Sequence, residues 1–199
     1  MLFGVMLMDL GDTGPAYPPP PAIASRREQD RGWFFRASSG VGTVARSSQR
    51  DLLELNGYED PGIRWHLLAD AAGFPWSRVG IGGFVGYSFR EVEPRSGGPP
   101  LEEEIYRLGA QVPLAFGTET VRFLLAPRLG VASGRQSLHG RGDFVLAPLF
   151  GADAGVIFPK VHIGLALAGY TAPVRASGDL GEREDFGGVE LLFSVYFDG

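Results

Sequence analysis

The sequence contains no cysteine, a single lysine (Lys160) and no long apolar run. The absence of cysteine excludes disulfides, thiolate metal sites and a cysteine nucleophile, and it fits any compartment, including an oxidising one in which stray thiols are a liability. No apolar run approaches the ~20 residues of a transmembrane helix, so a membrane protein built from helices is excluded. The net charge of −5 provides no basic excess, and we therefore expect no nucleic-acid partner.

What the sequence has instead is alternation, seen most clearly in its last residues, FGGVELLFSVYFDG (186–199). Every second residue from Val189 to Phe197 is apolar, whereas Glu190, Ser194 and Asp198 fall in the opposite row. A period of two is that of a β-strand. The pattern alone does not say whether the apolar row faces a core or lipid, because a soluble strand and a membrane-barrel strand give the same alternation.

Eight such stretches follow one another from Gly32 onward, and no segment has convincing helical periodicity. They cover residues 33–43, 63–70, 78–90, 106–117, 121–131, 143–156, 160–170 and 189–198. Long connections rich in Gly, Pro and charge, at about 46–61, 91–104, 134–142 and 172–186, alternate with short ones such as GFPWS, FGTE and FPK. We expect an N-terminal leader at 1–31, either part of a secretory signal or a flexible segment, which contains the proline run YPPPPA, and one barrel domain at 32–199.

Three observations indicate which way the rows face. The apolar rows carry no charged residue in any of the eight stretches, and every opposite row carries at least one. The polar rows are rich in Gly and Ala, which would weaken a solvated strand but make room for long side chains inside a narrow barrel. Aromatic residues gather near the ends of the apolar rows, as interface girdles require. The sequence therefore predicts an all-β fold, an eight-stranded antiparallel up-and-down transmembrane β-barrel.

The alternative is a soluble lipocalin-like barrel that encloses its apolar row and binds a small apolar ligand. The solvent-exposed outer face of such a barrel would be almost free of lysine and rich in glycine. It would also have to pack many large aromatic side chains into a narrow lumen.

This pattern, the hairpin rhythm and the closing GGVELLFSVYFDG resemble the small eight-stranded outer-membrane β-barrel family of Gram-negative bacteria, over residues 32–199. The resemblance implies a location in the cell outer membrane, with the termini and short turns in the periplasm and the long loops outside. It also implies partners in outer-membrane lipid, lipopolysaccharide and the barrel assembly machinery, which reads a terminal aromatic residue. Here Phe197 is followed by Asp198 and Gly199, which departs from the family's usual ending.

We expect a plugged, charged lumen and a monomeric structural or surface-interaction protein that acts as a scaffold or in adhesion. The expected lumen network comprises Arg36, Arg64, His66, Asp70, Arg107, Arg122, Arg128, Asp153, His162 and Glu190. The expected lipid-facing residues are Trp65, Val85, Leu125, Leu165, Leu191, Phe193 and Val195. Counting along the hairpins predicts that Glu190 lies near Ala168 and Gly40, whereas Glu103 is expected in a solvated outer loop.

Other motifs give weaker signals, and we expect no enzyme activity, cofactor or metal site. Ser137-Leu138-His139 places a hydroxyl and an imidazole in one expected loop, but a nucleophile and its base also need a third group that orients the base. His66 and His162 lack an apparent third metal ligand. The tripeptide RGD (141–143) and the acidic runs LEEE (101–104) and GEREDF (181–186) are typical of solvated loops. An external partner is not identified by any of them.

Overall fold

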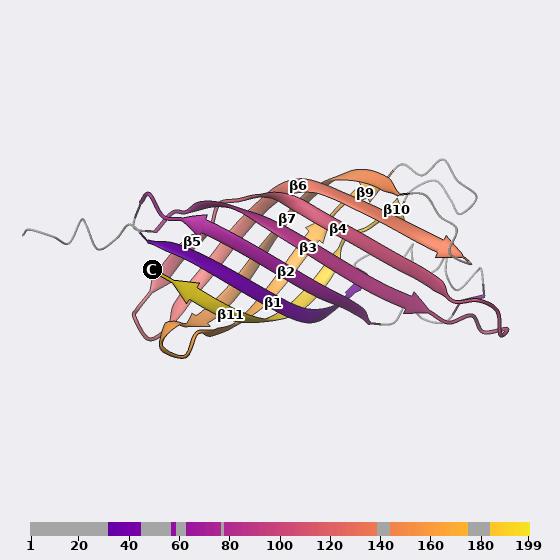
Figure 1. Cartoon of the computed structure of the whole chain (residues 1–199), viewed down its shortest axis with the longest axis horizontal. Helices are drawn as coiled ribbons and strands as arrows, with labels where there is room; N and C mark the ends of the chain where they lie inside the picture. The colour runs from indigo at the N-terminus through magenta and orange to yellow at the C-terminus, as the bar shows by residue number, and fades with distance from the viewer. Residues whose placement is uncertain (1–31, 45–56, 59–62, 77, 139–143, 175–183) are drawn as a thin grey trace, which may run out of the picture.

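The chain forms a closed antiparallel β-barrel (Figure 1). The computed structural model describes residues 32–44, 57–58, 63–76, 78–138, 144–174 and 184–199, so the expected leader at 1–31 lies outside the described residues. The eight barrel strands are β1 (Trp33–Val44), β2 (Arg64–Gly73), β3 (Ile81–Val92), β4 (Leu101–Gln111), β6 (Arg122–Leu138), β7 (Val145–Phe158), β8 (Ile163–Thr171) and β11 (Gly188–Asp198). The short elements are β5 (Leu114–Gly117), β9 (Pro173–Val174), β10 (Glu184–Asp185) and the 3-10 turn η1 (Pro159–Val161).

Every barrel strand is paired antiparallel on both sides. Neighbours in sequence pair with each other, β4 pairs with β6, and β1 pairs with β11 to close the sheet. Closure removes the free strand edges that an open sheet would expose. The predicted fold class is therefore confirmed.

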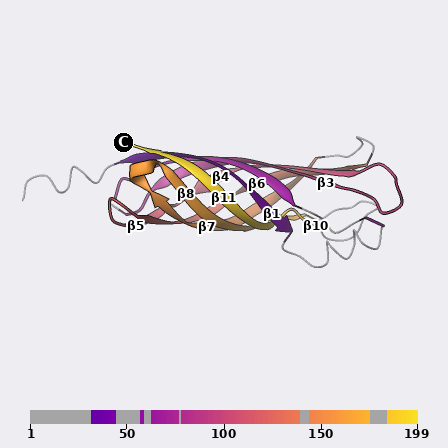
Figure 2. The same ribbon diagram turned by 90° about the horizontal axis from the view of Figure 1, so that it is seen from below.

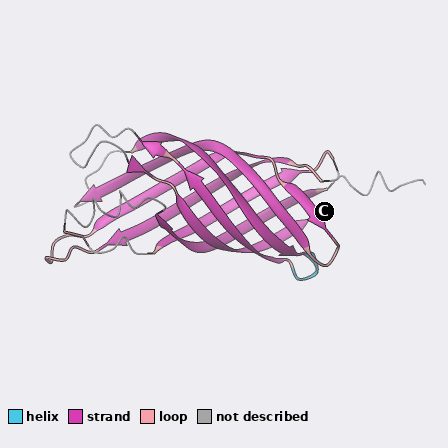
Figure 3. Cartoon of the chain, turned by 180° about the vertical axis from the view of Figure 1, so that it is seen from behind, coloured by secondary structure: helices cyan, strands magenta, loops and turns pink. Residues whose placement is uncertain are grey.

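The connections divide the barrel into two different ends, which lie at opposite ends of its long axis (Figures 2 and 3). The short-turn end holds the C-terminus together with the described connecting residues 74–76, 78–80, 118–121 and 159–162. The long-loop end holds the connection at 93–100 and the small hairpin formed by β9 and β10. Among the described residues, no helix is long and apolar enough to cross a membrane.

Three strands continue further toward the long-loop end than the sequence suggests. The expected connection at 91–104 shrinks to 93–100, because β3 continues to Val92 and β4 begins at Leu101. The expected connection at 134–142 is also partly strand, since β6 continues to Leu138 and pairs with the start of β4. The acidic run LEEE is therefore part of β4, and Glu103 points into the barrel rather than into solvent.

A second difference lies at the other end of β4. The expected fourth stretch, 106–117, is interrupted after Gln111, and the chain resumes pairing with β6 as β5. Pro113 lies in the gap, where its missing N–H cannot donate to a strand ladder. β4 therefore ends at Gln111, just before the proline, and pairing with β6 resumes at Leu114.

The interior is apolar at both ends, and between them charged groups lie among buried apolar side chains such as Leu68, Phe84 and Leu149. At the short-turn end Phe34 stacks on Tyr196, with ring centroids 5.5 Å apart, beside Leu124 and Ile157. Toward the long-loop end the buried apolar cluster includes Phe186, which precedes β11 and is only 1% exposed. A Cβ added at Gly134 would lie 2.6 Å from the Phe186 ring, so the glycine makes room for this aromatic cap.

Candidate functional site

We call the apolar cluster around Phe34 and Tyr196 at the short-turn end and the one around Phe186 toward the long-loop end the two apolar caps. The lumen between these caps holds three groups of ion pairs. We call the group nearest the short-turn end the lower network; it consists of Arg36, Asp70, Arg128 and Asp153. Arg36 Nη2 lies 2.7 Å from Asp70 Oδ2 and 2.6 Å from Asp153 Oδ2. Arg128 Nη2 lies 3.0 Å from the same Asp70 oxygen, and its guanidinium stacks over the Phe84 ring at 5.0 Å. The lower network therefore joins four strands across the barrel.

The middle network is built around Glu190 on β11. Arg107 Nη1 donates to Glu190 Oε1 at 2.5 Å, and His66 Nδ1 lies 2.7 Å from the same oxygen. Arg107 Nη2 also donates to Ser88 Oγ at 2.8 Å, and its guanidinium lies 4.4 Å over the Tyr170 ring. Glu190 is 1% exposed, so these contacts replace the water that a charged carboxylate would otherwise bind.

The upper network lies closest to the long-loop end and contains Glu103, Arg64 and Arg90. Glu103 bridges the two arginines: Oε1 pairs with Arg64, and Oε2 lies 2.7 Å from Arg90 Nη2. Arg64 Nη1 also donates to the carbonyl oxygen of Phe186 at 3.2 Å. The upper network thus fastens the aromatic cap to the barrel wall.

Asp185 on β10 holds the chain that carries this cap. Its Oδ1 accepts hydrogen bonds from the backbone N–H groups of Ala172 and Gly187, at 2.7 and 2.8 Å, and its Oδ2 accepts from Thr171 Oγ1 at 2.8 Å. These bonds tie the two ends of the β8–β11 connection together, so that Phe186 is held over the lumen.

The sequence prediction for the lumen and the structure overlap only in part. Most of the expected lumen residues lie in the lower, middle and upper networks, and the structure adds Arg90 and Glu103 to them. Two expected members lie elsewhere. Arg122 is at the short-turn rim, where its partly exposed Nη1 lies 3.1 Å from Asp198 Oδ2. His162 is exposed in the turn before β8 with a φ of 56°, and its Nδ1 lies 3.1 Å from the carbonyl oxygen of Tyr196.

The expected register of Glu190 is right on one side and shifted on the other. Glu190 lies opposite Ala168 on β8, as the hairpin count predicts. On β1 it lies opposite Gly42 rather than Gly40. The difference arises because the β1–β11 pairing closes the barrel, and its stagger is not set by any hairpin turn.

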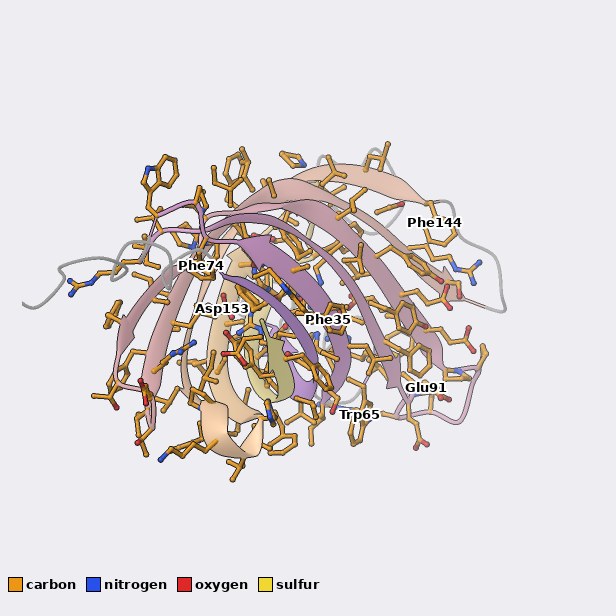
Figure 4. All side chains as sticks on the ribbon, turned by 60° about the vertical axis from the view of Figure 1, so that its left-hand side comes forward. Phe35, Trp65, Phe74, Glu91, Phe144 and Asp153 are labelled. Carbon is orange, nitrogen blue, oxygen red and sulfur yellow. The ribbon has the colours of Figure 1, made fainter. Side chains whose placement is uncertain are left out.

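The outer surface of the barrel is an apolar belt (Figure 4). The seven residues expected to face lipid are all exposed on it: Trp65 64%, Val85 52%, Leu125 38%, Leu165 52%, Leu191 55%, Phe193 50% and Val195 40%. The soluble alternative required this row to point inward, and the structure places it outward. A contiguous apolar surface of this extent is typical of contact with lipid rather than water.

The structure adds little support for catalysis or adhesion through the motifs at 137–139 and 141–143. Ser137 Oγ lies 3.5 Å from Glu102 Oε2, but His139 and the tripeptide 141–143 are outside the described residues. The residues that are described contain no group of three or more His, Asp or Glu side chains placed to hold a metal ion.

Comparison with known proteins supports the fold. No protein-family model matches the sequence, and neither does any curated protein. Among solved structures, the chain is similar to Neisserial surface protein A, with a TM-score of 0.56 and 13% identity over 83% of this chain and 95% of that one. It is also similar to Ail, the attachment invasion locus protein of Yersinia pestis (TM-score 0.44, 12% identity, 85% and 97% covered). A third similar structure is the outer membrane enzyme PagL (TM-score 0.48, 13% identity, 80% and 98% covered).

The predicted resemblance to small outer-membrane barrels is confirmed at the level of the fold. The predicted location in the outer membrane agrees with both this fold and the exposed apolar belt.

Proposed function

We propose that this protein is a closed outer-membrane barrel that works as a scaffold and surface-interaction protein, presenting the loops of its long-loop end to the outside. The observation that carries this proposal is the filled lumen. The three networks cross the barrel between two apolar caps, and the cavity lined by Arg107, Arg128 and Tyr170 has a volume of about 10 Å³. Such a space holds about one water molecule, which argues against a channel for solutes.

The pairing and burial of the lumen carboxylates argue against a catalytic role inside the barrel. A carboxylate that serves as a base or nucleophile must be free to reach a substrate. Asp70, Asp153, Glu103 and Glu190 are each paired with arginine and are at most 2% exposed. Their arrangement fits a role in holding the wall together.

The orientation can be tested by labelling, because the chain has no cysteine of its own. Ser96→Cys places a thiol in the exposed connection at 93–100, and Lys160→Cys places one in the exposed turn η1. A membrane-impermeant maleimide added to intact cells should label Ser96→Cys alone, whereas both variants should be labelled after lysis. Labelling of Lys160→Cys alone in intact cells would reverse the proposed orientation.

The absence of a channel can be tested in planar bilayers. We expect the reconstituted barrel to show no steady ion conductance. Reproducible conductance steps from the folded protein would contradict the scaffold role and indicate that the networks open a path.

A further inference from the structure

A small cavity lies inside the barrel where the lower and middle networks meet. Its volume is about 10 Å³, the space of one water molecule. Its charged lining consists of one arginine from each network, Arg128 on β6 and Arg107 on β4. The remaining described residues that line it are apolar or glycine, apart from Tyr170, and none of them is a carboxylate. Two cations therefore border a space that no anionic side chain reaches.

Both guanidiniums are held with one face against an aromatic ring that also lines the cavity. The guanidinium carbon of Arg107 lies 4.4 Å from the Tyr170 ring centroid, and that of Arg128 lies 5.0 Å from the Phe84 ring centroid. A ring against the face of a guanidinium leaves its N–H donors directed sideways, in the plane of the group. The directions of these donors are thus fixed before any ligand binds.

Each of the two arginines has a donor that the networks do not use. Arg107 uses both Nη atoms in the middle network, whereas its buried Nε has no hydrogen-bond partner in the part of the chain that the structure describes. Arg128 uses Nε for Gln111 and Nη2 for Asp70, and no described residue accepts from its Nη1. The two side chains are only 4% and 6% exposed. Because a buried donor without a partner is costly, these arginines favour a ligand that accepts hydrogen bonds.

Charge and hydrogen bonding favour an anion over water in this cavity. A buried water molecule must donate hydrogen bonds as well as accept them, but the lining has no carboxylate, and the backbone beside it is paired in the β7–β8 ladder. The like charges of Arg107 and Arg128 also repel each other, whereas an anion between them attracts both. We propose that this cavity is a binding site for one small monovalent anion, of which chloride is the common example.

The size and the closure of the cavity restrict the anion. Phosphate, sulfate and carboxylates need more space than one water molecule, whereas chloride is only slightly larger than water and needs a small outward shift of the two arginine side chains. The two apolar caps close the lumen, so the ion enters during folding or when a cap opens. Once bound, it joins the middle network to the lower one. It therefore stabilises the folded barrel by mass action, because the unfolded chain has no such site.

Diffraction at long X-ray wavelength identifies the bound species directly, because chloride then scatters anomalously and water does not. The barrel is folded from urea into detergent in sodium chloride, and in parallel in sodium gluconate, whose anion is too large for the cavity. Crystals of the chloride-folded barrel should show one anomalous peak between Arg107 and Arg128, and crystals of the gluconate-folded barrel should show none. Density for an ordered water molecule without an anomalous peak in the chloride-folded barrel would overturn the proposal.

The urea midpoint in lipid vesicles gives a second measurement, with chloride exchanged for gluconate at constant ionic strength so that general screening stays equal. The midpoint of the wild type should rise with chloride and then level off. Ala168→Val enlarges a buried side chain that lines the cavity, and it should abolish this chloride dependence without changing any charge. Ala166→Val is the matched control, because Ala166 is equally buried on β8 but does not line the cavity. Equal chloride dependence of the two variants would contradict the site, and the anomalous peak of the wild type decides the question if Ala168→Val does not fold.

Discussion

Arg90 Nη2 and Glu103 Oε2 lie 2.7 Å apart inside the barrel, on neighbouring strands that continue past the apolar belt. Both side chains are 1% exposed, and Glu103 also pairs with Arg64. One carboxylate thus neutralises charge from β2 and β3 at the level where the lumen meets the Phe186 cap. Its loss would leave two buried arginines without this partner.

Glu103→Ala should therefore destabilise the barrel strongly. Removing one partner of a buried pair costs about 3–5 kcal/mol, because the remaining charge is left uncompensated in a poor solvent for ions. Urea unfolding in lipid vesicles, followed by tryptophan fluorescence, measures the effect. Glu91→Ala, on the exposed face of β3, is the control and should change stability little. Similar unfolding curves for the two variants would show that Glu103 is solvated.

The misplacement of Glu103 in the sequence analysis has a physical cause. The segment EVEPRSGGPPLEEE has the proline, glycine and charge of a loop, and it is pairing with β3 and β6 that makes its last part a strand. Alternation placed Arg90 on the polar row, but no local sequence signal indicated that Glu103 is its ion-pair partner. Strand pairing above the membrane is a tertiary effect that composition does not reveal.

The division of each strand into two faces could be predicted from the sequence, because a period of two separates the faces without any knowledge of which strands pair. Alternation places Phe193 and Glu190 on opposite faces of β11, and the glycine-rich polar rows and aromatic row ends then indicate that Phe193 faces outward and Glu190 inward. The register between β1 and β11 depends on barrel closure, so Gly42 rather than Gly40 lies beside Glu190 on the neighbouring strand. Residues at strand ends were misassigned for a related reason: His162 falls in a turn with left-handed backbone, where alternation stops.

The apolar belt gives a second prediction. Phe193 is 50% exposed on β11, and arginine at mid-membrane on a lipid-facing position costs about 2–4 kcal/mol. Phe193→Arg should impair insertion into vesicles, as measured by the heat-modifiable shift of the folded barrel in electrophoresis. Ser194→Ala is the neighbouring control: it removes one buried hydrogen bond to Ser38 Oγ, at 2.8 Å, and should cost about 1 kcal/mol. Equal insertion of both variants would contradict the assignment of the outer face.

The aromatic cap gives a third prediction, which concerns coupling between Gly134 and Phe186. Gly134→Ala should destabilise the barrel, because the new Cβ would lie 2.6 Å from the Phe186 ring. Phe186→Ala alone should cost about 3–5 kcal/mol for the lost packing. In the Phe186→Ala background, however, Gly134→Ala should cost far less, since the clashing ring is gone. Additive effects on the urea midpoint would show that the two residues do not touch.

The last prediction concerns Glu190 and Arg107, the central pair of the middle network. Glu190→Ala leaves Arg107 buried beside Ser88, His66 and Tyr170, none of which is a carboxylate, and Arg107→Ala leaves Glu190 beside His66. Each single change should lower the free energy of unfolding by about 3–5 kcal/mol, because each leaves the opposite charge buried without its partner.

The double variant removes both charges at once, so its cost should fall below the sum of the single changes by about 1–3 kcal/mol, the range found for residues that interact directly. Unfolding in vesicles at matched lipid content completes the cycle. Arg122→Ala combined with Glu190→Ala is the control pair, because Arg122 lies at the short-turn rim with Asp198 and should add independently. If Glu190 and Arg107 were as additive as the control pair, the 2.5 Å contact between them would not hold the lumen together.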